Sequence, residues 1–173
     1  MTLKVLTLLL GISAARPKIA DYPFTTLAPN LGVVQMSDHR TFVVADIPGI
    51  IEGAHEGKGL GLQFLRHIER TRLLAFLIPI DAEDWQAEYG HLRSEVEQYS
   101  EELAAKPHCV VFTKMDLLGD DEPPPIEAPE AFGVFAISAA ARTGLDELLL
   151  AWWRRVLEMK KAVLTPVRDV ELP

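Results

Sequence analysis

The sequence predicts one α/β domain with a mostly parallel sheet and one antiparallel hairpin strand. Short β-rich apolar runs alternate with longer helical patterns, which is typical of this class. The chain has 173 residues, the length of one domain, and 49% of them are apolar against 24% charged, so it can bury a sizeable core. Its 17 basic and 25 acidic side chains give a net charge of −8, which argues against nucleic-acid binding by bulk electrostatics.

Cysteine content and hydropathy narrow the class further. Cys109 is the only cysteine in the sequence, which excludes a disulfide framework and a cysteine-rich metal site and fits a reducing cytosol. The apolar run of residues 3–12 contains Lys4, Thr7 and Gly11 and falls short of the roughly 20 residues that span a bilayer. A secretory signal peptide is the alternative interpretation of this run. We expect no membrane span.

The first half of the chain predicts a hairpin, a loop and a helix. Residues 31–36 and 41–46 are short apolar runs joined by the polar turn Ser37-Asp38-His39-Arg40, a pattern typical of an antiparallel hairpin. A glycine cluster over residues 53–61 follows, and apolar side chains recur at helical spacing over residues 62–72. Residues 3–10 favour a helix, with a strand as the alternative.

The second half predicts three buried strands and an intervening helix. Residues 73–80 are almost continuously apolar, as expected of a strand covered on both faces, and Asp81 ends the run. An amphipathic helix is predicted over residues 88–103. Two further strands are predicted at residues 108–113 and 134–137.

A loop and a last helix complete the predicted elements. The acidic, proline-rich residues 119–129 are expected to form a surface loop. Apolar side chains recur at helical spacing over residues 145–160, and Asp146 and Glu147 suit a first helical turn. We therefore predict a domain over residues 1–160 and a tail or linker stub over residues 161–173.

The tetrad Asp46-Ile47-Pro48-Gly49 directly follows the apolar run Phe42-Val43-Val44-Ala45 of the predicted hairpin. An acidic residue at the carboxyl end of a strand can hold Mg²⁺, usually through water, and a nearby glycine allows a terminal phosphate to approach its backbone N–H. As an isolated tetrapeptide, the motif is more often a simple proline turn.

Two further motifs follow predicted strands. In Thr113-Lys114-Met115-Asp116 the carboxylate can accept hydrogen bonds from the ring N–H and the amino group of guanine, a pattern that adenine does not offer. A capping or turn aspartate is the alternative for this motif alone. Ser138-Ala139-Ala140 supplies small residues whose backbone N–H groups could meet a guanine oxygen.

These three motifs, in this order, resemble those of the GTPase superfamily of P-loop NTPases. The run from Ser13 to Leu27, continued by Pro29-Asn30-Leu31-Gly32-Val33-Val34, is similar to the first switch region of the Obg family. Residues 46–54, 57–61 and 64–70 are similar to its second switch region. The resemblance covers about residues 7–160 and implies a three-layer, Ras-like G domain that binds GTP and GDP.

The resemblance also implies roles for residues near the phosphates. Thr25 and Thr26 are the candidates for the switch threonine that binds Mg²⁺, and we favour Thr26. Asp46 would contact Mg²⁺ through a bound water molecule, and Gly49 would sense the terminal phosphate. Ile50 stands where Ras-like proteins place the glutamine that orients the attacking water, so hydrolysis is expected to be slow and no catalytic residue is assigned.

The resemblance assigns the remaining motif residues to the guanine pocket. Asp116 would recognise guanine, the stem of Lys114 would lie along the base, and Ser138 with Ala139 would close the pocket. Thr113 stands where the family usually has asparagine, so it keeps a hydroxyl but loses the amide. We expect a lower nucleotide affinity in consequence.

One motif of the superfamily is absent from the sequence. No Gly-x-x-x-x-Gly-Lys-[Ser/Thr] loop occurs, because Gly57-Lys58-Gly59 has glycine where a hydroxyl residue is needed and belongs to the second switch. The resemblance begins at Thr7, so we expect the first strand and the phosphate-binding loop to be missing from this G domain.

The resemblance implies a GTP/GDP switch linked to assembly of the large ribosomal subunit and to stress signalling, in a cytoplasmic monomer with Mg²⁺ as cofactor. A second hypothesis is a nucleotide-incompetent module that keeps the switch surfaces and docks a partner. A third is a truncated product without an independent role. The missing phosphate-binding loop favours the second hypothesis for the chain in isolation.

Overall fold

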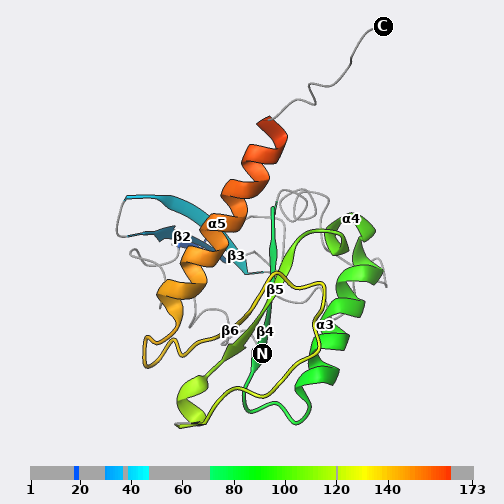
Figure 1. Cartoon of the computed structure of the whole chain (residues 1–173), viewed down its shortest axis with the longest axis vertical. Coiled ribbons are helices and arrows are strands. Elements are labelled where there is room, and N and C mark those ends of the chain that lie inside the picture. The colour runs from blue at the N-terminus through cyan, green and yellow to red at the C-terminus, as the bar shows by residue number, and fades with distance from the viewer. Residues whose placement is uncertain (1–17, 20–29, 37–38, 47–70, 120, 165–173) are drawn as a thin grey trace, which may run out of the picture.

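The computed structural model describes residues 18–19, 30–36, 39–46, 71–119 and 121–164. The strands of these residues form two three-stranded sheets, with helices packed against them (Figure 1). The predicted α/β class is confirmed. The helices predicted over residues 3–10 and 62–72 lie outside the described residues.

The first sheet is antiparallel and has the order β1-β2-β3. It consists of β1 (Lys18–Ile19), β2 (Asn30–Gln35) and β3 (Thr41–Asp46). At the turn of the β2–β3 hairpin, the backbone N–H of Met36 donates to the carbonyl of Arg40 over 2.8 Å. The predicted hairpin is thus confirmed, whereas β1 was not predicted as a strand.

The second sheet is parallel and has the order β4-β5-β6. Its strands are β4 (Leu74–Pro79), β5 (His108–Thr113) and β6 (Val134–Ala136). All three predicted strands are present, and the central strand β5 is buried along its whole length. A single sheet was expected, but within the described residues β3 does not pair with β4. The two sheets are joined through side chains instead.

The prediction of one continuous helix over residues 88–103 is wrong, because the structure has two helices there. The structure has α3 (Trp85–Tyr99) followed by the short α4 (Glu101–Ala104). Ser100 separates them with an extended backbone, and its side chain accepts a hydrogen bond of 3.2 Å from the N–H of Leu103. A serine at this position caps a new helix better than it continues an old one, because its hydroxyl satisfies an N–H of the first turn.

The helix α5 (Leu145–Leu164) covers the opposite face of the parallel sheet from α3 (Figure 1). Its buried side chains, Leu145, Leu148, Leu149 and Trp152, follow the helical repeat. It continues past Lys160, where the sequence pattern placed its end. The domain boundary at that point stays a prediction.

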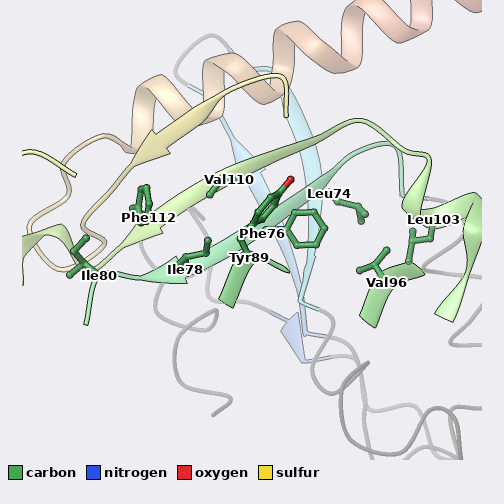
Figure 2. Packing of buried hydrophobic residues seen from close by; sticks show 9 residues of the cluster. All are labelled: Leu74, Phe76, Ile78, Ile80, Tyr89, Val96, Leu103, Val110 and Phe112. Atoms are coloured by element: carbon green, nitrogen blue, oxygen red, sulfur yellow. The ribbon is translucent and has the colours of Figure 1, made fainter. Parts of the chain in front are cut away.

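Alternate residues of β5 belong to two hydrophobic clusters. Val110 and Phe112 pack in one cluster with β4, α3 and α4, and Figure 2 shows both residues among the side chains of this cluster. Cys109 and Val111 pack in the other cluster, with α5. Because successive side chains of a strand point to opposite faces, β5 is the centre of a three-layer arrangement.

The antiparallel sheet joins this core through its inner face. Val34 of β2 is fully buried in the cluster that contains α5. The ring of Phe42 lies 6.4 Å from the rings of both Trp152 and Trp153, and the guanidinium of Arg40 lies 5.0 Å from the centre of the Trp153 ring. Helix α5 therefore packs against both sheets.

The predicted loop of residues 119–129 is anchored to α3 near its end. The side-chain amide of Gln86 donates to the carbonyl of Glu127 over 3.1 Å and accepts from its N–H over 2.9 Å. Ile126 packs against the core beneath it. None of the helices in the described parts of the chain is long and apolar enough to cross a membrane.

Candidate functional site

The end of β5 makes a sharp turn into a short 3₁₀ helix. Thr113, the last residue of β5, is buried and its carbonyl accepts a hydrogen bond of 3.0 Å from the N–H of Ile80. Lys114 follows with a φ of 61°, in the left-handed region that non-glycine residues rarely adopt. The 3₁₀ helix η2 (Met115–Leu117) begins directly after it. This turn places Asp116 beyond the carboxyl edge of the parallel sheet.

The chain after β6 forms a tight loop beside this turn. Ser138 and Thr143 exchange two backbone hydrogen bonds of 3.1 Å, so residues 138–143 close on themselves. Ala139 is half-buried and Ala140 is exposed within this loop. The N–H of Met115 donates to the carbonyl of Ile137 over 3.1 Å and joins the two strand ends.

Asp116 and Ser138 meet through their side chains. The hydroxyl of Ser138 donates to Oδ1 of Asp116 over 2.5 Å, and Oγ of Ser138 accepts from the backbone N–H of Ala141 over 2.9 Å. Ser138 is fully buried whereas Asp116 is exposed. The hydrogen bond from Ser138 fixes the direction of the Asp116 carboxylate. The carboxylate remains accessible to a ligand because Asp116 is exposed.

Lys114 forms an ion pair that the motif did not predict. Its Nζ donates to Oδ2 of Asp81 over 2.6 Å, and Asp81 lies directly after β4 and Ile80. The only available signal in the sequence was that Asp81 follows an apolar strand. Three of the described strand ends, those of β4, β5 and β6, thus contribute side chains to one cluster: Asp81, Lys114, Asp116 and Ser138.

The predicted phosphate and Mg²⁺ residues are not all described. Asp46 closes β3, where its backbone is paired in register with Asn30 of β2. Its side chain, together with Thr25, Thr26, Ile47, Pro48 and Gly49, lies outside what the structure describes. In the described part of the chain, no three His, Cys, Asp or Glu side chains gather as a possible metal site.

Comparison with known proteins identifies the family. The model of the 50S ribosome-binding GTPase family matches residues 6–114. The GTPase Obg of Chlorobium chlorochromatii is 58% identical over 160 residues, which cover 92% of this chain and 46% of that protein. The chain belongs to the Obg family of GTPases. The match to the family model includes β1 to β5 and ends at Lys114.

Two further Obg proteins show the same extent of similarity. The GTPase Obg of Chloroherpeton thalassium is 57% identical over 152 residues, 88% of this chain and 46% of that protein. The GTPase Obg of Chlorobaculum tepidum is 55% identical over 150 residues, 87% of this chain and 44% of that protein. This Obg-family chain therefore spans less than half the length of the curated relatives it matches.

Proposed function

We propose that this chain binds guanine nucleotides as the G domain of an Obg-type GTPase, and that the loops after β5 and β6 hold the guanine base. The observation that supports this most directly is the 2.5 Å hydrogen bond from Ser138 to Asp116. It brings together two residues that are 22 positions apart and that the family resemblance assigns to one pocket. A simple turn aspartate would not require a buried serine from the next strand end.

The chemistry of the pocket follows from the accessible carboxylate. Ser138 engages Oδ1 of Asp116, and an ionised carboxylate has about four acceptor positions in all. The remaining positions can accept the ring N–H and the amino group of guanine side by side. Adenine presents an acceptor nitrogen in place of that ring N–H, so it would leave the carboxylate facing a lone pair.

The finer functions rest on family resemblance and on the hairpin. Thr26 and Asp46 would hold Mg²⁺, for which hydroxyl and carboxylate oxygens are suitable ligands. In the sequence, β2 begins at Asn30, four residues after Thr26, and β3 ends at Asp46. Hydrolysis would be slow because Ile50 cannot orient a water molecule. A cytoplasmic monomer that acts on the large ribosomal subunit completes the proposal.

Calorimetric titration with GDP, GTP and ADP tests the base pocket. We expect binding of GDP and GTP but not of ADP. Asp116→Asn should weaken GDP binding by about 100-fold, since hydrogen bonds to a charged acceptor contribute roughly 1.5–3 kcal/mol each. The same variant should gain affinity for xanthosine diphosphate, because xanthine has a carbonyl where guanine has its amino group and an amide can donate to it.

The matched control is Asp121→Asn, which removes the same charge from an exposed position in the loop after η2. It should leave the affinity for GDP unchanged. Circular dichroism of each variant checks that it folds. If the folded chain binds no guanine nucleotide, the proposal fails and the second hypothesis, a module that docks a partner without nucleotide, replaces it.

A further inference from the structure

Two carboxylates lie near Lys114: Asp81 contacts it in space, and Asp116 follows it two residues later in the sequence. The two carboxylates have different partners in the structure. Lys114 pairs with Asp81 over 2.6 Å, although Asp116 lies only two residues away in sequence. Asp116 is bonded to Ser138 instead. Within the described residues, no ion pair joins Lys114 to Asp116. The nearer carboxylate along the chain is thus left without the lysine.

We propose that Asp81 is a positioning residue of the base pocket: it holds the Lys114 ammonium group away from Asp116 and keeps the lysine stem where a guanine base can lie against it. This inference rests on the proposed function. Without Asp81, the ammonium group would be drawn toward the next available carboxylate, which is Asp116. The guanine donors would then compete with an ammonium group for the same oxygens.

The backbone around Asp81 is fixed relative to Lys114. Strands β4 and β5 are adjacent and parallel, with Pro79 in register with Thr113. Beyond that pair, the N–H of Ile80 donates to the carbonyl of Thr113 over 3.0 Å, and the indole N–H of Trp85 donates to the carbonyl of Ile80 over 3.0 Å. Asp81 therefore projects from a turn that is tied to both β5 and α3.

The backbone of Lys114 sets the other side of the pair. Its φ of 61° turns the chain at the end of β5, and η2 fixes the residues that follow. A lysine side chain at such a turn has several free torsions, so its backbone alone does not determine where its charge lies. The ion pair with Asp81 selects one direction for the ammonium group.

The exposure of the pair shows that it is not a general stabiliser of the fold. The side chains of Lys114 and Asp81 are 38% and 48% exposed, and ion pairs of this kind contribute little to stability. Removing the carboxylate should therefore leave folding intact. That separation makes an effect on the pocket measurable without a general loss of structure.

The test compares Asp81→Asn with the control Glu83→Gln, which removes a negative charge from an exposed position two residues away. The first readout is the rate at which acetic anhydride acylates Lys114 in the nucleotide-free chain, measured by mass spectrometry. We expect Asp81→Asn to change this rate by about threefold or more at low salt, where exposed pairs are least screened. The control should leave it unchanged.

The second readout is the dissociation constant for GDP. Asp81→Asn should raise it by roughly three- to tenfold, Asp81→Glu should restore part of the loss, and the thermal midpoint should stay within the range of surface substitutions. A merely structural role would move the thermal midpoint together with the affinity.

Each outcome decides the inference. If the wild-type chain binds GDP and Asp81→Asn binds it equally well, the positioning role is overturned while the proposed function stands. If the wild-type chain binds no guanine nucleotide, this measurement overturns the proposed function but does not decide the role of Asp81. The acylation rate still decides whether Asp81 directs Lys114, because an unchanged rate in Asp81→Asn overturns the inference and a changed rate supports it.

Discussion

Replacing Gly144 with alanine should destabilise the chain through two separable effects. Gly144 joins the loop of residues 138–143 to α5 and has a φ of +71°. A Cβ atom on it would lie 2.1 Å from the carbonyl oxygen of Ala136 and 3.2 Å from Cγ2 of Ile137. The first effect is the left-handed backbone, and the second is the collision with the backbone of β6.

The magnitude follows from these two effects. A left-handed conformation costs an L-residue about 1–2 kcal/mol. The contact with Ala136 involves a backbone oxygen at the end of β6, so relief requires a shift of the strand, at a cost of about 1–3 kcal/mol by analogy with overpacked cores. Together they give roughly 3 kcal/mol, which corresponds to a fall of about 6–12 °C in the thermal midpoint of a domain of this size.

Two other glycines separate the effects. Gly119 has a similar φ of +70° but its Cβ would meet nothing within 4 Å, so Gly119→Ala should show the backbone cost alone. Gly90 lies in α3 and its Cβ would also meet nothing within 4 Å, so Gly90→Ala should stabilise the chain by up to about 1 kcal/mol.

The assay is urea unfolding of the three variants, followed by far-ultraviolet circular dichroism. The expected order of stability is Gly90→Ala, wild type, Gly119→Ala and then Gly144→Ala. If Gly144→Ala is no less stable than Gly119→Ala, the collision with Ala136 does not operate and the reasoning is refuted.

Three further outcomes are expected. Burial lowers the pKa of His108 below its usual 6.5; the charge of Arg93 lowers it further, and the charge of Glu130 opposes the shift. The neutral ring is therefore the form that stabilises the fold. The stability that the neutral His108 ring contributes should be fully present above pH 6.5 and decline as the pH falls through 6.5 toward the lower pKa of the folded chain. Equal urea midpoints at pH 7.5 and 5.5 would contradict this, and so would a His108→Gln variant whose urea midpoint depends on pH as that of the wild type does. Burial raises the pKa of Cys109 to about 12, so a thiol reagent should modify the native chain far more slowly than the urea-unfolded chain, and rapid native reaction would refute its burial. Gln86→Ala should lower stability by about 1 kcal/mol and speed proteolysis near Glu127, because it removes both hydrogen bonds to that backbone; an unchanged cleavage rate would show that the loop does not depend on Gln86.

Much of the parallel sheet could be predicted because local pattern and burial agree there. All six residues of β5 are buried. Its four consecutive apolar residues, 109–112, are typical of a strand covered on both faces. Once β5 and β6 are parallel neighbours, their carboxyl ends meet at one edge. The meeting of Asp116 with Ser138, which the family resemblance assigns to one pocket, then follows from this topology.

The break at Ser100 could not be read from periodicity. Apolar side chains at Val96 and Leu103 are both buried in the same cluster, so the helical stripe continues across the break. What ends α3 is a backbone rotation at Ser100 and its capping of Leu103, and neither alters the hydrophobic pattern.

Contacts between distant segments also escaped prediction. Asp81 and Lys114 are 33 residues apart, and their pairing depends on which strands are neighbours and in which register. Gln86 and Glu127 are 41 residues apart, and an amide that pairs with a loop backbone has no sequence signature. The phosphate and Mg²⁺ residues, Thr26 and Asp46 among them, stay predictions.

The position of α5 at the end of the described chain has a consequence for synthesis. Its Trp152 packs against β5 through a hydrogen bond of 3.3 Å to the sulfur of Cys109 and against β3 through the ring of Phe42. The apolar faces that these strands present to α5 are therefore made well before the helix that covers them. During translation at about 5–20 residues per second, those faces stay uncovered for some seconds until α5 leaves the exit tunnel. Exposed apolar strands favour aggregation, so the late synthesis of α5 leaves the nascent chain open to it during this interval.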